Sequence, residues 1–186
     1  GHYGLPIWLA IAAVLLLGIV VGLINGNLVV RTAVPSFIVT LGTLFAMAGF
    51  ILGLSVIITG TTSVAITAPP LAKAIFGDLY FGKQFQVIIA WWLAALAAYI
   101  YFVHYSRYGN WLFAMGGDKE SARNAGIPTR KMTITLFVLS ATSAAFVGMC
   151  QAILFNSAQV SGGQSFIFNS IIAVVVGGVL LTGGFG

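Results

Sequence analysis

Charged side chains are scarce along this chain. Only 6% of its 186 residues are charged, whereas 60% are hydrophobic, and the mean hydropathy is +1.07. A soluble domain carries roughly a quarter charged residues. A chain this poor in charge folds only where lipid covers most of its surface, so the composition predicts an integral membrane protein.

Acidic residues are the scarcer of the two charged classes, three against eight basic ones. A basic excess can indicate nucleic-acid binding. Here, however, the basic residues lie at the ends of apolar runs, where they face lipid headgroups and set the orientation of the chain. We therefore expect a lipid bilayer and no nucleic acid as the partner of this charge.

Groups for covalent or metal chemistry are also missing. The single cysteine, Cys150, lies in an apolar run, so an intrachain disulfide is excluded. His2 and His104 are far apart in sequence and lack acidic neighbours, which predicts no metal site. No glycine-rich nucleotide-binding loop is present, and no nucleophile stands with a general base. We expect no catalytic site and no cofactor.

Neither end has the features of a complete chain. No initiator methionine and no basic segment precede the first apolar stretch, which argues against a signal peptide. No polar tail follows the apolar run that closes at 183–186. The pattern predicts a fragment, truncated at both ends, in which 1–186 is one transmembrane domain.

Long apolar runs dominate what remains. A helix that crosses the hydrocarbon core needs about 20 mostly apolar residues. Candidate spans cover 5–24, 37–59, 85–103, 132–155 and 170–185, the last being a span or the first part of one. The predicted fold is an all-α polytopic membrane bundle with about five spans.

Two connections between these spans have features of their own. The first run is predicted to break at Asn25-Gly26-Asn27. In the polar-interrupted stretch 60–84, apolar residues recur at helical spacing after two prolines, which predicts a short helix at the membrane surface. The recurring residues are Leu71, Ile75 and Leu79, after Pro69-Pro70.

Small residues in the fourth run and a glycine pair in the second predict close helix packing. Ser140, Thr142 and Ser143 lie among alanines, and Gly49 and Gly53 form a G-x-x-x-G match. Both patterns let helix backbones approach one another. Neither pattern requires chemistry.

The distribution of basic residues predicts the orientation. The loop 104–131 is richest in them, and lysine- and arginine-rich loops stay on the cytoplasmic side. Alternation of the spans then places Arg31 on the same side and Lys73 and Lys83 outside. The basic residues of the loop are Arg107, Lys119, Arg123, Arg130 and Lys131.

No charged residue falls in the middle of a predicted span. Ion-coupled carriers and pumps usually place an ionisable group at membrane depth, because their driving force acts on it. Either such a group lies in a missing part of the subunit, or the energy comes from a partner. We favour the partner.

The loop 104–131 also contains a predicted short helix. Gly109-Asn110 and Gly116-Gly117 are read as turns. Asp118 can cap a helix that runs to Ala125, Gly126 suits the position after its end, and Pro128 blocks continuation. A capped helix of about two turns, projecting from a membrane bundle, is suited to dock a soluble partner; the alternative is a solvated loop.

The stretch RYGNWLFAMGGDKESARNAGIPTRKM resembles the cytoplasmic loop of permease subunits of ATP-binding-cassette importers for monosaccharides, the ribose, xylose and galactose type. Two further stretches, NGNLVVRTAVPSFIVTLGTLF and GGQSFIFNSIIAVVVGGVLLTGGFG, resemble segments of the same family in the same order. The family is longer at both ends, in agreement with the fragment interpretation.

The resemblance implies partners and site residues. It implies a permease dimer driven by a cytoplasmic ATPase, with an extracytoplasmic sugar-binding protein that delivers the substrate. The helix after Gly117 resembles the coupling helix that contacts the ATPase. The expected docking residues are Asp118, Glu120, Ser121, Arg123, Ala125 and Gly126.

A substrate path lined by small and polar residues is expected across the bundle, because a neutral polyol needs hydrogen-bonding groups and no charge. For each residue the alternative is ordinary interhelical bonding or loop solvation. The candidates are Thr40, Thr43, Asn156, Gln159 and Gln164. The chain departs from many sugar permeases at 168–170, where Phe-Asn-Ser replaces an acidic stretch.

Three other functions stay open at this point. A branched-chain amino-acid permease of the same superfamily shares the glycine-rich late segment. An ion-coupled secondary carrier belongs to another class, and a purely structural membrane subunit is the third. The sequence does not identify the sugar.

Overall fold

The computed structural model describes residues 6–32, 34–80 and 85–179. These residues fall into two compact units, one drawn from 1–90 and 134–163, the other from 91–133 and 164–186. Two long helices belong partly to each unit, because the divisions fall near one end of each.

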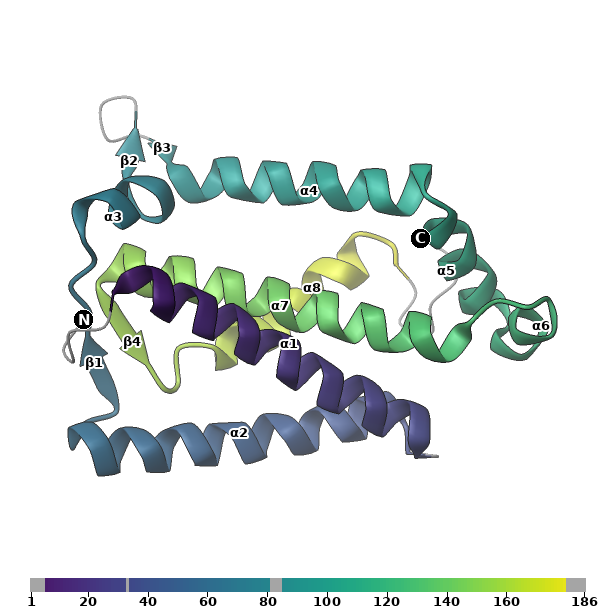
Figure 1. The fold of residues 1–186 in the computed structure, drawn as a ribbon, viewed down its shortest axis with the longest axis horizontal. Helices are drawn as coiled ribbons and strands as arrows, with labels where there is room; N and C mark the ends of the chain where they lie inside the picture. The colour runs from purple at the N-terminus through teal and green to yellow at the C-terminus, as the bar shows by residue number, and fades with distance from the viewer. Residues whose placement is uncertain (1–5, 33, 81–84, 180–186) are drawn as a thin grey trace. The chain divides into compact units, whose positions relative to one another are not determined.

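Four helices in the described part of the chain are long and apolar enough to cross a bilayer. They confirm the first four predicted spans, and each is longer than or shifted from its prediction by a few residues (Figure 1). The four are α1 (Ile7–Arg31), α2 (Ser36–Thr59), α4 (Val87–Tyr105) and α7 (Thr129–Phe155).

Shorter elements fill the connections. The helices are α3 (Pro70–Phe76), α5 (Arg107–Gly117), α6 (Lys119–Asn124) and α8 (Gln164–Val176). The strands are β1 (Ser63–Ala65), β2 (Leu79–Tyr80), β3 (Phe85–Gln86) and β4 (Ser157–Gln159). β1 pairs antiparallel with β4, and β2 with β3.

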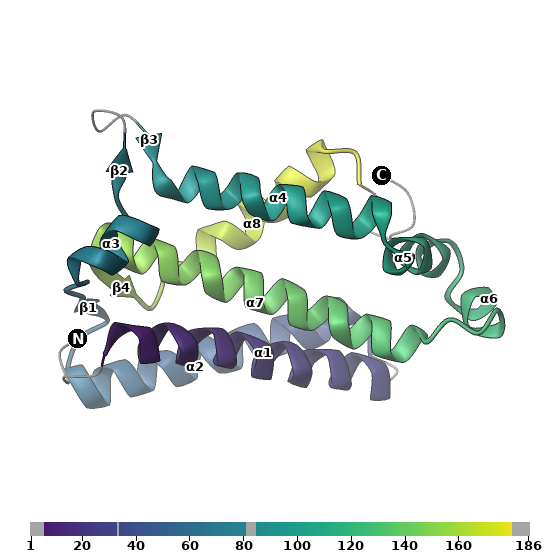
Figure 2. The same ribbon diagram turned by 45° about the horizontal axis from the view of Figure 1, so that its top comes forward.

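In the first unit, α1 lies along α7 through three glycines spaced four residues apart. A Cβ atom at Gly18 would lie 2.8 Å from Ala145 Cβ, one at Gly22 2.6 Å from Val138 Cα, and one at Gly26 2.9 Å from Ile134 Cα. The two helices run side by side in both ribbon views (Figure 2). The absence of side chains on one face of α1 therefore allows the two backbones to touch.

Three residues of the predicted small-residue face of α7 pack against these glycines of α1. Ala141, Thr142 and Ala145 all lie within contact distance of Gly18. The predicted G-x-x-x-G pair behaves differently, because nothing described lies within 4 Å of a Cβ atom at Gly49 or Gly53.

The second contact of the first unit is made by α3 at the far end of α7. Phe76 packs with Met149, Cys150 and Ile153, all buried, and its ring meets that of Phe146 edge-on at 6.2 Å. The predicted short helix is confirmed at Pro70–Phe76. Leu79, assigned to it from spacing, lies in β2 instead, because the helix has already ended at Gly77.

The predicted break at Asn25-Gly26-Asn27 is wrong, since α1 continues to Arg31. Gly26 is the third glycine of the contact with α7. The side-chain amide of Asn27 donates from Nδ2 to Leu23 O at 2.8 Å, within the helix. Residues that end helices in water are tolerated in membrane helices, where tertiary contacts satisfy or cover them.

The fifth predicted span is only partly confirmed. Its helix begins at Gln164 rather than Ser170 and ends at Val176. It ends there because Gly178 adopts a left-handed φ of 81° and its amide bonds back to Val175 O at 3.0 Å. The predicted residues 180–185 lie outside the described residues.

The predicted turns at Gly109-Asn110 and Gly116-Gly117 are wrong, because both pairs lie inside α5. Gly109 is buried, and a Cβ atom there would collide with the carbonyl oxygen of Val103. The glycine therefore allows α5 to fold closely against the end of α4, a tertiary reason that spacing alone does not reveal.

Candidate functional site

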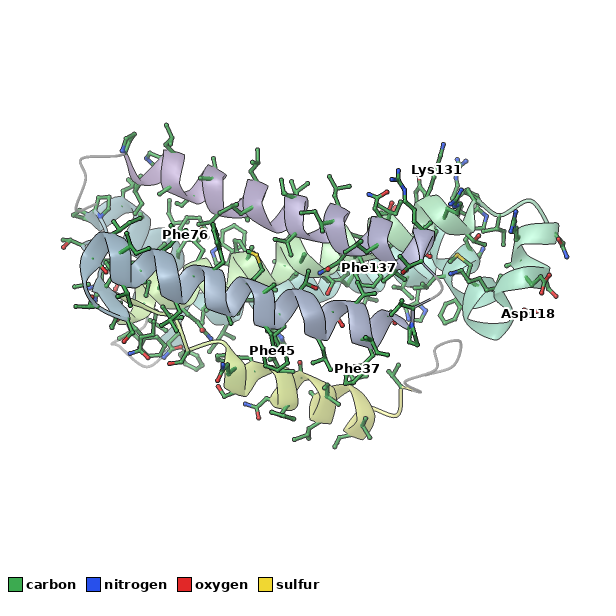
Figure 3. The ribbon with its side chains drawn as sticks, turned by 90° about the horizontal axis from the view of Figure 1, so that it is seen from below. Phe37, Phe45, Phe76, Asp118, Lys131 and Phe137 are labelled. Carbon is green, nitrogen blue, oxygen red and sulfur yellow. The ribbon has the colours of Figure 1, made fainter. Side chains whose placement is uncertain are left out.

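The helix predicted after Gly117 is present as α6, and its N-terminal cap is Asp118. Asp118 Oδ1 accepts from the Glu120 amide at 3.0 Å, and Oδ2 accepts from the Ser121 amide at 3.3 Å and from the Ser121 hydroxyl at 2.5 Å. Figure 3 shows Asp118 at the start of this helix. One carboxylate thus satisfies two amides that a helix start leaves without partners.

These bonds also hold the pKa of Asp118 below its ordinary value. The Ser121 hydroxyl is the largest cause and the Glu120 amide the second, because both donate to the charged carboxylate. The carboxyl group therefore stays ionised at neutral pH, and its negative charge lies at the positive end of the α6 dipole.

The C-terminal end of α6 is closed as tightly as its start. Gly126 has a left-handed φ of 86°, its amide bonds to Arg123 O at 3.0 Å, and the Ile127 amide bonds to Ala122 O at 3.1 Å. This pair of bonds defines a Schellman motif. α6 therefore has both ends fixed by local bonds, although it contains only six residues.

All six expected docking residues are exposed, whereas other residues of the same segment are buried. Ala122 is buried and holds the helix against its surroundings, and Thr129 and Met132 at the start of α7 are buried as well. α6 packs against α5. The exposed members are Asp118, Glu120, Ser121, Arg123, Ala125 and Gly126.

Aromatic contacts fix the corner from which α6 extends. The rings of Phe102 and Tyr108 stack at 5.6 Å, and Tyr108 meets Trp111 edge-on at 5.5 Å. His104 lies against Phe113 with ring centroids 6.4 Å apart. These contacts join the end of α4 to α5, so the short α6 begins from a defined position rather than from a loose loop.

The expected path residues of the first unit lie in two separate places. Thr40 and Thr43 are in the first two turns of α2. Asn156 and Gln159 follow α7 and lie beside 63–66, the segment just beyond the other end of α2. At 1.5 Å per residue, the length of α2 from Thr43 to Thr59 is about 24 Å, so these residues do not form one cluster.

Three of the path residues, Thr40, Asn156 and Gln159, already take part in hydrogen bonds or strand pairing. Thr40 donates to Ser36 O and Phe37 O within its own helix, both at 3.0 Å. Asn156 has a φ of 50° and its carbonyl accepts from the Ile66 amide at 2.9 Å, and Gln159 is paired with Ser63. Gln164, in the second unit, is the first residue of α8.

Asn25 is a polar residue of this region that sequence reasoning missed. The Thr43 hydroxyl donates to Asn25 Oδ1 at 2.7 Å and so links α2 to α1. The sequence pattern predicts a helix break at Asn25, whereas the continuation of α1 brings Asn25 to the level of Thr43. The side chain of Asn25 is half-buried in this contact.

No cluster of three or more potential metal ligands occurs among the residues that the structure describes. His2 lies outside the described residues. The described residues offer a short exposed helix, α6, and hydrogen-bonding groups along α1 and α2.

Comparison with known families gives one match over nearly the whole chain. The family described as branched-chain amino acid transport system / permease component matches residues 2–185. No solved structure matches the chain at a significant level.

Curated relatives give a consistent second finding. The chain is 31% identical over 188 residues to the inner membrane ABC transporter permease protein YjfF of Escherichia coli, covering 100% of this chain and 55% of the relative. It is 33% identical over 184 residues to the autoinducer 2 import system permease protein LsrD of Escherichia coli and of Shigella flexneri, covering 98% of this chain and 55% of each relative. The chain thus spans about half the length of these relatives.

Proposed function

Because the chain belongs to the branched-chain amino acid transport system / permease component family, we propose that it forms part of the membrane subunit of an ATP-driven importer. It is a multi-pass protein of the inner membrane. The proposed cargo is a monosaccharide or similar polyol, carried across the cytoplasmic membrane. ATP hydrolysis belongs to a separate subunit.

The observation that carries this proposal is α6, a short exposed helix fixed at both ends. A partner that pushes on a membrane bundle needs a rigid element to push on, and a frayed two-turn helix would absorb the motion. Asp118 and Gly126 remove that freedom at the two ends. The chain leads from α6 through 125–128 directly into α7, so a displacement of α6 acts on a spanning helix.

The charge distribution supports an external source of energy. Charged side chains of the four spanning helices lie only in terminal turns, at Arg31 of α1 and at Arg130 and Lys131 of α7. An ion-coupled carrier would use an ionisable group at membrane depth. A partner ATPase docked on α6 supplies the driving force instead.

The proposed transport path uses neutral groups at two levels. Thr40 and Thr43 lie near the end of α2 that follows Arg31, on the proposed cytoplasmic side, and Asn156 and Gln159 lie at the opposite end. Hydroxyl and amide groups exchange hydrogen bonds with a polyol without changing charge. Alternating access would expose the two levels in turn.

The partners follow from the same proposal. They are a cytoplasmic ABC ATPase at α6, an extracytoplasmic sugar-binding protein at the opposite face, and a second permease subunit. Asp118, Glu120, Ser121, Arg123, Ala125 and Gly126 would form the ATPase contact.

The docking role is tested by deleting 118–126 from the intact permease. We expect the variant to reach the membrane but to lose co-purification with the ATPase, because the exposed helix is gone while the spanning helices remain. A deletion of Gly162-Gly163, outside the proposed contact, is the control and should keep the ATPase. Unchanged assembly of the α6 deletion would contradict the assignment.

The cargo is tested with the complete transporter in proteoliposomes. Uptake of labelled ribose, xylose or galactose, dependent on ATP and unaffected by collapse of ion gradients, is expected. Uptake of leucine with no uptake of sugar would favour a branched-chain amino-acid permease. Branched-chain amino acids are the substrates named in the family description. Loss of uptake on collapsing an ion gradient would instead indicate a secondary carrier.

A further inference from the structure

The C-terminal ends of α2 and α7 are tied together by a two-stranded ribbon. β1 follows α2, and β4 follows α7 after the single residue Asn156. The register pairs Ser63 with Gln159, Val64 with Ala158 and Ala65 with Ser157. Segments 94 residues apart in sequence are thereby joined directly.

The ladder continues beyond the assigned strands at both ends. The Ile66 amide donates to Asn156 O at 2.9 Å, and the Val160 amide donates to Thr62 O at 3.2 Å. The hydroxyls of Ser63 and Ser157 lie 3.1 Å apart across the ribbon. Backbone bonds of this kind act together, so the two chain segments separate only if the whole ribbon opens.

The ribbon is also fixed to the helix that precedes it. The Ser55 hydroxyl donates to Thr61 O at 2.6 Å, and the Thr59 hydroxyl contacts the same oxygen at 3.2 Å. Gly60 closes α2 with a left-handed φ of 70°. The turn from α2 into β1 therefore has little freedom to act as a hinge.

Two more contacts join α2 and α7 to a third helix, α1. Gly18, Gly22 and Gly26 hold α1 against α7 by backbone contact over two helical turns. Phe137 of α7 belongs to the same contact (Figure 3). Its Cβ would lie 3.3 Å from a Cβ atom added at Gly26. The Thr43–Asn25 hydrogen bond joins α2 to α1.

From these contacts we propose that α1, α2 and α7 from Ile134 onward move as one rigid body during transport, with the β1–β4 ribbon as the strap that closes it. Each pair of the three helices has its own link: the glycine face for α1 and α7, the hydrogen bond for α1 and α2, and the ribbon for α2 and α7. Close-packed interfaces of this kind shift as blocks rather than deform continuously. The inference rests on the proposed alternating-access function, and it assigns the opening motion to parts of the permease outside this body.

The test is a disulfide across the strap, made by S63C/S157C in the intact transporter. The serine hydroxyls are 3.1 Å apart, so thiols at these positions lie within reach of a disulfide bond. We expect the bond to form on mild oxidation and to leave ATP-driven uptake at the rate of the reduced protein. Crosslinking rates should be the same without nucleotide and with ATP and vanadate.

The control variant is S63C/A158C, because Ala158 faces the opposite side of the ribbon from Ser157. It should crosslink much more slowly. Single variants S63C and S157C report whether the buried Cys150 or a second subunit takes part, since such products differ in gel mobility.

The strap is overturned if S63C/S157C forms no disulfide, if its rate of formation depends on nucleotide, or if oxidation abolishes uptake and reduction restores it. A reduced transporter that imports no sugar would count against the proposed function instead. The nucleotide dependence of crosslinking would still decide the strap in that case, because it does not require knowledge of the cargo.

Discussion

Asp118 is the residue on which the local structure of α6 depends most directly. Replacing it with alanine removes the carboxylate oxygens that accept from the Glu120 and Ser121 amides. We therefore expect α6 to fray and the coupling between ATP hydrolysis and uptake to fall several-fold. Asp118→Ser keeps a capping oxygen and should retain most of the coupling. Faster hydrogen exchange at the Glu120 and Ser121 amides in Asp118→Ala, measured by mass spectrometry, would locate the effect at the cap.

The ionisation of Asp118 gives this cap a definite dependence on pH. The Ser121 hydroxyl and the Glu120 amide lower the pKa of the folded state below the ordinary value of 3.8. An acidic group whose pKa is lowered by folding stabilises the fold fully at pH values above its pKa in the unfolded state. That stabilisation is lost as the pH falls through its pKa in the folded state. Exchange at Glu120 and Ser121 should therefore stay slow from neutral pH to about 4 and rise only below it, once corrected for intrinsic rates. Asp118→Asn, which does not ionise, should show no such rise.

Gly22 is the tightest point of the contact between α1 and α7. An alanine there would place its Cβ 2.6 Å from Val138 Cα and 2.8 Å from Phe137 O, both backbone atoms that cannot rotate away. We expect Gly22→Ala to destabilise the permease by about 1–3 kcal/mol, the usual range for overpacking. Gly42→Ala is the matched control, since nothing described lies within 4 Å of its Cβ. Equal unfolding curves in SDS titration for the two variants would contradict the close contact.

At the scale of elements, α1 and α2 are linked by the hydroxyl of Thr43. Thr43→Val removes the bond to Asn25 and should weaken the helix pair by about 0.6 kcal/mol, the average for such bonds in membranes. Thr40→Val is the control, because Thr40 bonds only to its own helix. A double-mutant cycle with Asn25→Ala measures the energy of the pair, with the thermal inactivation of transport as the readout. A coupling energy of zero would show that the bond does not hold the two helices together.

The short elements show why part of this fold follows from sequence and part does not. α6 was predicted with its cap at Asp118 and its end at Gly126 because both signals act on neighbouring residues. α5 was missed because its glycines resemble turns. Their reason is the approach of Val103 to Gly109, a contact that exists only after the chain has folded.

The long helices show the same division. Their existence follows from apolar length, which the bilayer imposes on any sequence. The continuation of α1 past Asn25 depends on α7, the helix that covers Gly26. The four-residue spacing of Gly18, Gly22 and Gly26 was a readable signal for that contact, stronger than the Gly49 and Gly53 pair that was noted.

At the scale of the whole molecule, the placement of the proposed path residues is the least predictable part. Polar residues were chosen one by one from composition, but whether they converge depends on how distant segments meet. Thr43 and Gln159 prove to be near opposite ends of α2, with Asn25 as an unforeseen neighbour of the former. Composition suggests which polar groups could line the proposed path, but the order of these groups along it depends on the folded arrangement of distant segments.

The orientation of the chain is a whole-molecule property that labelling can test. α7 contains 27 residues, which corresponds to about 40 Å and exceeds the roughly 30 Å hydrocarbon core. Residues before and after α7 therefore lie on opposite sides of the membrane. The basic residues of 104–131 predict that α6 lies in the cytoplasm and the β1–β4 ribbon outside.

The experiment uses Lys119→Cys and Thr62→Cys, both at exposed positions, in intact cells treated with a membrane-impermeant maleimide. Thr62→Cys should react in intact cells, whereas Lys119→Cys should react only after the membrane is opened. Cys150, fully buried in α7, should stay unlabelled in both conditions and serves as the internal control. Labelling of Lys119→Cys from outside would reverse the topology, and α6 would then lie on the side of the membrane where no ATPase can reach it.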